Sequence, residues 1–204
     1  MSLPLQNQHP GRKQPSQARG RQKYEALLAA TASLMEEQGY EALTTKAIAA
    51  RADSAIGSFY QFFSNKEAAV NALVQGYRSR IRDFLGQSVA RAADGGLNSD
   101  DVENMIVGLA EIYRDLPGFG GIWAGNFEDG PLKSQAQRLQ REVFDGMNAA
   151  LRVAFPEVSV EDRERCLATT LETAKHLLAN AEDPERTFTE MRRMLGLYIA
   201  SYFG

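Results

Sequence analysis

Cysteine and histidine are nearly absent from this chain of 204 residues. The single cysteine, Cys166, excludes an intramolecular disulfide and any metal site built from several thiolates. We expect it to be a small packed residue rather than a redox sensor. Of the two histidines, His9 lies in a Pro- and Gln-rich stretch, which leaves His176 without a histidine partner for a metal. We therefore expect no metal and no cofactor, and the lack of a recognisable nucleophile–base–acid arrangement argues against an enzyme.

Long apolar runs are also missing. No stretch reaches the ~18 residues that a membrane helix needs, and the first 17 residues contain no apolar core of a secretory signal. Hydrophobic residues nevertheless make up 44% of the chain and charged residues 24%, which is a globular composition. We expect a soluble, cytoplasmic protein of one or two domains without a membrane partner.

Proline is absent between Ser16 and Leu116, although three prolines fall within the first 15 residues. Residues 1–20 are rich in Pro, Gln, Gly and Ser, and the first 24 residues carry five basic side chains and no acid. These features predict a disordered basic arm. Residues 1–86 hold 11 Lys or Arg against 7 Asp or Glu, whereas residues 87–204 hold 12 against 19. This asymmetry indicates an N-terminal half that binds a polyanion, unless the basic tail serves only solubility.

Apolar residues recur with spacings of three and four, so the fold class is all-α. Gly39 follows the first helix, and Ser64 with Glu67 forms a capping-box pattern before a long helix. The expected helices span about 21–38, 44–51, 55–62, 64–93, 100–115, 131–155, 159–181 and 184–203. The intervening segment 116–130 is expected to form short helical turns and loops.

Two short helices joined by residues 52–55 have the spacing of a helix-turn-helix. The surrounding sequence, YEALTTKAIAARADSAIGSFYQFFSNKEAAVNAL, resembles the DNA-binding domain of tetracycline-repressor-like (TetR family) transcriptional regulators. The resemblance covers about residues 21–75 and includes Gly-Tyr after the first helix, Thr-Thr, Ile-Gly-Ser, the aromatic cluster and Asn-Lys-Glu-Ala. It implies a three-helix DNA-binding domain over 21–66 and a helical domain over 67–204 that binds a ligand and forms a homodimer.

The residues of this motif also suit DNA by their own chemistry. Thr44, Thr45 and Lys46 open a helix, where a phosphate is stabilised. Gly57 allows close backbone approach, Ser58 and Gln61 can bond to base edges, and Ile56 can contact a thymine methyl group. Family resemblance gives Tyr60 a phosphate contact, and Lys66 is expected to be a second phosphate anchor. The full predicted DNA-binding set is Thr44, Thr45, Lys46, Ser54, Ala55, Ile56, Gly57, Ser58, Tyr60, Gln61 and Lys66.

Two positions of the turn depart from the family pattern. Asp53 stands where relatives usually have Gly, and Ser54 replaces an apolar residue. We expect Ser54 to cap the recognition helix, although altered DNA contacts are the alternative. Phe59 and Phe63 are expected in the core of the small domain, while the role of Phe62 stays open.

In the second half, the family resemblance assigns dimerisation to the helices near 159–181 and 184–203. Their apolar residues exceed one narrow face, which also suits a dimer, although a wide face can simply fill a larger core. A glycine- and aromatic-rich segment around residues 116–130 suits the wall of a pocket for an apolar or aromatic effector. The predicted ligand-binding residues are Tyr113, Phe119, Trp123, Phe127, Met147 and His176, with plain core packing as the alternative for each.

The sequence thus predicts a repressor that a small molecule releases from a palindromic double-stranded operator. Activation instead of repression is an alternative. So is a constitutive architectural DNA-binding protein without a ligand, which would show strong salt dependence and little sequence preference.

Overall fold

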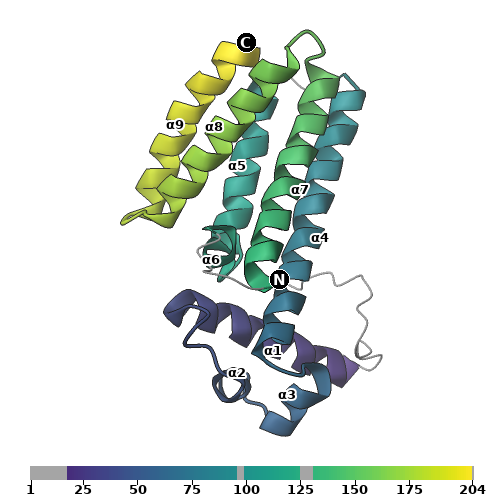
Figure 1. The fold of residues 1–204 in the computed structure, drawn as a ribbon, viewed down its shortest axis with the longest axis vertical. Coiled ribbons are helices and arrows are strands. Elements are labelled where there is room, and N and C mark those ends of the chain that lie inside the picture. Colours follow the sequence, from purple (N-terminus) through teal and green to yellow (C-terminus); the bar gives the residue numbers. More distant parts are fainter. Residues whose placement is uncertain (1–17, 96–98, 125–130, 204) are drawn as a thin grey trace. The chain divides into compact units, whose positions relative to one another are not determined.

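All regular secondary structure in the described part of the chain is helical. A computed structural model describes residues 18–95, 99–124 and 131–203. The helices are α1 (Ala18–Gln38), α2 (Thr45–Arg51), α3 (Ile56–Phe62), α4 (Lys66–Ala93), α5 (Ser99–Asp115), α6 (Phe119–Ala124), α7 (Pro131–Ala154), α8 (Val160–Ala179) and α9 (Pro184–Phe203) (Figure 1). The all-α prediction is confirmed, and the predicted helices lie within a few residues of the observed ones.

The two ends of α1 can be compared with their predictions. Gly39 ends α1 as expected: its φ is +76°, and its N–H donates to the Met35 carbonyl at 3.0 Å. At the other end, α1 begins at Ala18, so residues 18–20 are helical rather than part of a disordered arm. The remainder of the predicted arm, residues 1–17, lies outside the described residues.

The predicted capping box before α4 is wrong. The side chain of Asn65, not Ser64, accepts from the backbone N–H of Ala68 at 2.9 Å. Glu67 does not turn back to the cap, because its carboxylate accepts the hydroxyl of Tyr40 at 3.0 Å. Helix α4 therefore starts one residue beyond the predicted position, with Asn, another favoured cap residue, in place of Ser.

The chain divides into two compact units. The first contains the chain up to Ser79 together with Leu116–Ile122, and the second contains Arg80–Asp115 and the chain from Trp123 onward. The compact units divide inside α4, beyond residue 66, where the sequence predicts the end of the DNA-binding domain. Tyr77 joins this part of α4 to the first unit. Its hydroxyl donates to the Pro117 carbonyl at 2.6 Å, and its ring packs edge-to-face on Phe119 with centroids 5.6 Å apart.

In the first unit, α2 packs on α1 and α3, and the first part of α4 completes the core (Figure 1). The fully buried side chains include Leu27, Leu28, Leu43, Ile48, Phe59 and Tyr77. A bidentate pair between Arg51 and Glu37, at 2.6 and 2.7 Å, ties α2 to α1 and lowers the pKa of that carboxyl. The core of this small unit is thus built from one face of each short helix.

The second unit is a bundle in which α9 packs on α5 and α8, and α8 packs on α7 (Figure 1). Ser159 caps α8 by accepting from the N–H of Asp162 at 3.1 Å, as its sequence predicts. Asp183 accepts from the N–H of Arg186 at 3.1 Å before α9, and Pro184 occupies the first helical position. No helix of the described chain is both long and apolar enough to cross a membrane.

Candidate functional site

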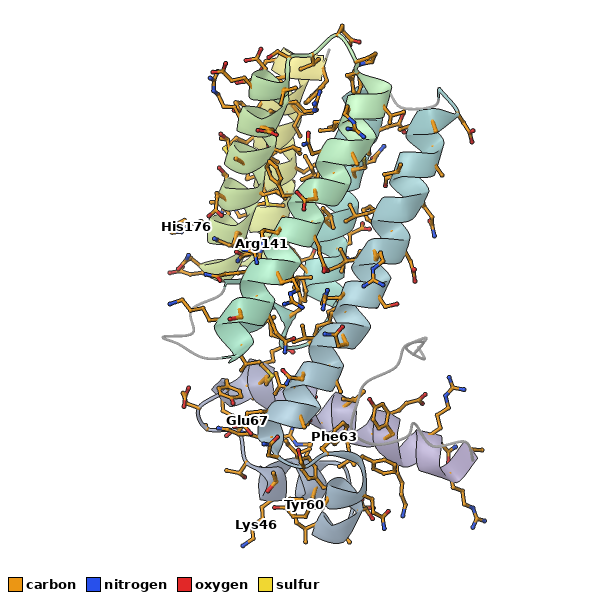
Figure 2. All side chains as sticks on the ribbon, turned by 45° about the vertical axis from the view of Figure 1, so that its right-hand side comes forward. Lys46, Tyr60, Phe63, Glu67, Arg141 and His176 are labelled. Carbon is orange, nitrogen blue, oxygen red and sulfur yellow. The ribbon has the colours of Figure 1, made fainter. Side chains whose placement is uncertain are left out.

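The amino end of α2 and the outer face of α3 lie together in the first unit. Thr44 caps α2 by accepting from the N–H of Ala47 at 3.1 Å. The hydroxyl groups of Thr45 and Tyr60 lie 3.3 Å apart and so join α2 to α3. Lys46 is exposed beside them, and Figure 2 shows Lys46 and Tyr60 at the same end of this unit. Four of the predicted residues therefore form one continuous surface.

Helix α3 separates its core residues from its predicted DNA-contacting residues. Phe59 is 0% exposed and Phe63 is 4% exposed, which confirms that both belong to the core. By contrast, Ile56 is 39% exposed and Tyr60 46% exposed, although both are large and partly apolar. Gly57, Gln61 and Ala55 are exposed on the same side, and Ser58 is half-buried. Large side chains held in the open by a short helix are typical of a contact surface.

Phe62, whose role the sequence leaves open, packs beside the core. It is half-buried, and its ring lies edge-to-face on Tyr24 of α1 with centroids 5.8 Å apart. Phe62 thereby links α3 to the first helix.

Gly57 has open space where a side chain would stand. Apart from the adjacent residues and the backbone of α3 itself, no heavy atom of the described residues lies within 4 Å of the position that a Cβ would occupy, and the backbone there has no positive φ. No contact among the described residues therefore requires glycine at this position. The space is available to an external partner that approaches the α3 backbone closely.

The turn between α2 and α3 differs in part from its prediction. Asp53 has a φ of +46°, so it adopts the left-handed conformation for which relatives use Gly. Ser54 does not cap the recognition helix: Ala55 occupies the cap position and makes no side-chain bond there. The backbone N–H of Ser54 donates to Ala49 at 2.9 Å, and its Oγ is buried without a hydrogen-bond partner. The left-handed residue turns Ser54 inward, away from the helix end.

Lys66 is anchored to the protein itself. Its ammonium group donates to the carbonyls of Tyr40 and Glu41 at 3.2 and 3.4 Å and lies 4.4 Å from the Tyr40 ring centroid. Burial and the bond to Glu67 raise the pKa of Tyr40 to about 12. An ammonium has three donors, so Lys66 has one left for a phosphate. The predicted anchor thus also closes the turn after α1, a role that its sequence pattern did not reveal.

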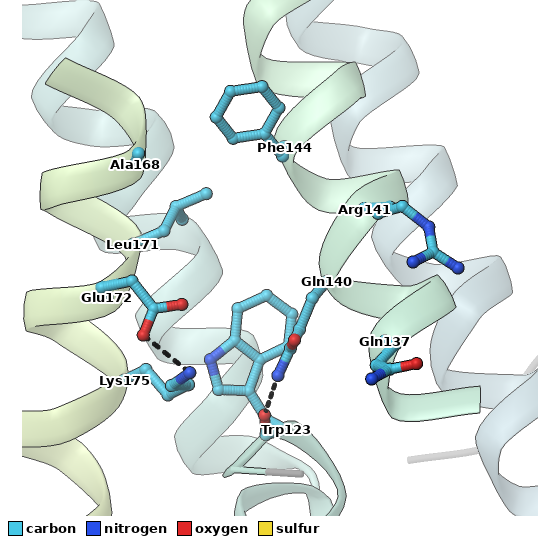
Figure 3. A pocket seen from close by; sticks show the side chains of 9 residues that line it. All are labelled: Trp123, Gln137, Gln140, Arg141, Phe144, Ala168, Leu171, Glu172 and Lys175. Atoms are coloured by element: carbon cyan, nitrogen blue, oxygen red, sulfur yellow. Dashed lines mark hydrogen bonds and ion pairs between the residues drawn. The ribbon is translucent and has the colours of Figure 1, made fainter. Parts of the chain in front are cut away.

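The second unit contains a cavity of about 360 Å³ between α7 and α8, with Trp123 of α6 at one side (Figure 3). Its lining residues are Trp123, Gln137, Gln140, Arg141, Phe144, Ala168, Leu171, Glu172 and Lys175. Gln140 fixes the wall by donating from Nε2 to the Trp123 carbonyl at 2.7 Å. Lys175 pairs with Glu172 at 2.7 Å. The cavity therefore combines an apolar wall with several charged and amide groups.

Of the predicted ligand-binding residues that the structure describes, Trp123 lines this cavity and Tyr113, Phe119, Met147 and His176 do not. Phe119 belongs to the first unit, where it packs on Tyr77, and Met147 is fully buried. Tyr113 is half-buried, and burial raises its pKa. His176 is exposed. Phe127 lies outside the described residues.

Sequence reasoning missed most of the cavity wall. The lining positions 137, 140, 141 and 144 of α7 and 168, 171, 172 and 175 of α8 both follow the spacing i, i+3, i+4, i+7. That spacing marks one face of a helix. The signal that could have found them was the mixture of Gln, Arg and aromatic residues on a single face of α7.

Helix α9 buries one stripe and exposes another. Met191, Leu195 and Ile199 are at most 3% exposed, whereas Met194 is 47% and Leu197 is 73% exposed. The wide apolar face expected from the sequence is therefore only partly used within the chain. The exposed stripe is the part available to a second subunit.

Comparison with known proteins places both halves of the sequence. The family model described as bacterial regulatory proteins, tetR family, matches residues 27–73, and the model described as tetracyclin repressor-like, C-terminal domain, matches residues 99–198. The uncharacterized HTH-type transcriptional regulator YdgC of Bacillus subtilis strain 168 is 24% identical over 184 residues, which cover 87% of this chain and 93% of YdgC.

Two solved structures have the same fold. A TetR-family transcriptional regulator from Streptomyces coelicolor is 26% identical with a TM-score of 0.55, and the match covers 88% of this chain and 99% of that one. The transcriptional regulator FadR from Bacillus subtilis, solved in complex with stearoyl-CoA, is 14% identical with a TM-score of 0.66. That match covers 87% of this chain and 98% of FadR.

Proposed function

Since the chain belongs to the TetR family of DNA-binding transcriptional regulators, we propose that it is a dimeric, ligand-responsive repressor. In this proposal, two copies of α3 read a palindromic operator, and a small molecule in the second unit releases the DNA. The observation that carries the DNA-binding part is the outer face of α3, where Ile56 and Tyr60 are exposed while Phe59 and Phe63 form the core.

The proposed roles on DNA follow from exposure and chemistry. Gln61 and Ser58 read base edges, Ile56 contacts a thymine methyl group, and Gly57 allows the helix to approach. Thr44, Thr45, Lys46, Tyr60 and Lys66 hold phosphates. Ala55 is exposed at the start of α3, and its small side chain allows this end of the helix to lie close to DNA. Ser54 is not proposed to contact DNA directly, because its Oγ is buried.

Ligand responsiveness is supported by the way α6 is shared. Phe119 and Ile122 pack in the first unit, and the next residue, Trp123, lines the cavity of the second. A ligand that displaces Trp123 would therefore also displace the adjoining segment 116–122, which packs in the same unit as the DNA-binding helices. FadR, which shares the fold, was solved with stearoyl-CoA, which supports a ligand in this chain as well. We propose repression rather than activation because the chain resembles tetracycline-repressor-like regulators.

The experiment is a selection of bound DNA from a random pool by the purified full chain, followed by titration of the selected site at several salt concentrations. An operator with two inverted half-sites, bound at least ~10³-fold more tightly than random DNA, supports the proposal. Binding with a steep salt dependence and no sequence preference would instead identify an architectural DNA-binding protein. In cells, a reporter behind the selected site distinguishes repression from activation.

A further inference from the structure

The cavity between α7 and α8 has a chemistry that selects its occupant. Its apolar wall consists of the Trp123 indole, the Phe144 ring and Leu171, with Ala168 leaving space between them. Its polar groups are two cations, one carboxylate and two amides. Figure 3 shows the two cations on opposite sides of the cavity: Lys175 comes from α8 and points toward Trp123, whereas Arg141 comes from α7 and its guanidinium points away from Trp123 and Lys175.

The single carboxylate does not neutralise the two cations. Arg141 makes no ion pair with any residue in the described ranges, and because it is exposed it adds a solvated positive charge to the cavity lining. Lys175 is paired with Glu172, but the two side chains differ in burial: Lys175 is 24% exposed and Glu172 is 70% exposed. A solvated carboxylate on a neighbouring turn holds its partner weakly. A bound anion can therefore replace Glu172 as the ion-pair partner of Lys175, and the Glu172 carboxylate is then solvated by water.

The size of the cavity limits the ligand further. Its volume of about 360 Å³ lies near the lower end of the roughly 300–1,000 Å³ typical of ligand sites. This suits a body of one or two rings or a short branched chain. The amides of Gln137 and Gln140 add polar groups at the α7 side.

We propose that the effector is a small organic anion: an aromatic or short aliphatic body on Trp123, Phe144 and Leu171, and an anionic head held by Lys175, with Arg141 adding positive charge on the opposite side of the cavity. This inference rests on the proposed function, since it names the ligand class of the proposed switch. A cationic ligand would meet two like charges and only one exposed carboxylate, and a neutral ligand would leave both cations without a new partner.

The test uses three probes with the same body, 4-butylbenzoate, 4-butylbenzamide and 4-butylbenzylammonium, added to the full chain. Trp123 is the only tryptophan of the sequence, so its fluorescence reports directly on the cavity. The carboxylate should bind roughly tenfold or more tightly than the amide, because its hydrogen bonds to cations are charge-assisted. The ammonium should bind most weakly. Equal affinities, or an order that favours the amide or the ammonium, overturn the proposal.

Variants assign the preference to particular side chains. Lys175→Met and Arg141→Met should each reduce the advantage of the carboxylate over the amide, while amide binding stays unchanged. Glu172→Gln should strengthen carboxylate binding by roughly twofold to fivefold, because it removes the competing anion. The control is Arg138→Met, which removes an exposed arginine of α7 that does not line the cavity. If Arg138→Met acts as strongly as Arg141→Met, the effect is one of net charge and the proposed head-group site is wrong.

A second readout separates this inference from the proposed function. Operator affinity is measured in parallel with each probe present. If the amide or the ammonium releases DNA and the carboxylate does not, the repressor is ligand-responsive but the anionic class is wrong. If the carboxylate binds and DNA affinity does not change, the anion site stands and the proposed switch fails.

Discussion

The ammonium of Lys66 lies over the ring of Tyr40, 4.4 Å from its centroid, and donates to the carbonyl of the same residue at 3.2 Å. One side chain therefore closes the turn after α1 and stands at the start of α4, where the family pattern expects a phosphate contact. A structural role and the proposed DNA-binding role therefore coincide at this position. They can be separated by comparison with Lys46, which is exposed and has no such bonds within the described chain.

We expect Lys66→Ala to lower the free energy of unfolding by about 1–2 kcal/mol, because it removes charged hydrogen bonds and a cation–π contact. Lys46→Ala should leave the free energy of unfolding within about 0.5 kcal/mol of wild type. Both variants should reduce the salt dependence of DNA binding by roughly one phosphate per half-site. Urea titrations and DNA titrations at several salt concentrations measure the two effects. A Lys46→Ala protein with an unchanged salt slope would remove Lys46 from the interface.

Gly57 offers a test of close DNA approach without damage to the fold. Because no described residue outside the local backbone of α3 lies within 4 Å of a Cβ at this position, Gly57→Ala should keep or raise the free energy of unfolding, by up to about 1 kcal/mol for alanine in a helix. Affinity for the selected operator should nevertheless fall, since the added methyl group stands between α3 and DNA. A variant that binds the operator as well as wild type does would show that the α3 backbone stays away from DNA.

Gly118 should behave in the opposite way. Its φ is +71°, and a Cβ there would lie 2.9 Å from the Ala32 carbonyl oxygen and 3.1 Å from Cβ of Met35. Gly118→Ala should therefore lower the free energy of unfolding by about 1–3 kcal/mol through backbone strain and the clash with backbone. Thermal melting of Gly118→Ala beside Gly57→Ala provides the comparison. Equal melting temperatures would contradict the packing of the 116–122 segment in the first unit.

The dimer prediction depends on the exposed stripe of α9. Leu197→Glu should leave the subunit folded, because Leu197 is 73% exposed. It should weaken dimerisation, because a two-fold interface would bury the new carboxylates of both subunits close together. Leu195→Glu, at a position only 3% exposed, should unfold the protein instead. Sedimentation velocity and circular dichroism of the two variants distinguish the outcomes. A Leu197→Glu protein that remains a tight dimer would place the interface elsewhere.

Local sequence patterns determined most of the fold. The small size of the DNA-binding domain predicted that Phe59 and Phe63 are buried, and the preferences of Ser and Gly for helix ends predicted that a helix starts at Ser159 and that Gly39 ends the first helix. These features depend on helical periodicity and on backbone preferences of single residues, which act over one or two turns. Family resemblance then added the DNA-binding role.

Tertiary structure decided the features that depend on distant partners. Glu67, which the capping-box pattern directs back to the start of its own helix, instead accepts the hydroxyl of Tyr40 from 27 residues away. Phe119 and Trp123 looked equivalent in the sequence, yet Phe119 packs on Tyr77 and Trp123 lines the cavity. The cavity wall itself is formed where faces of α7 and α8 meet, and the pairing of helix faces is set by the packing of the whole bundle. Periodicity tells which residues share a face, but only the folded chain decides what that face meets.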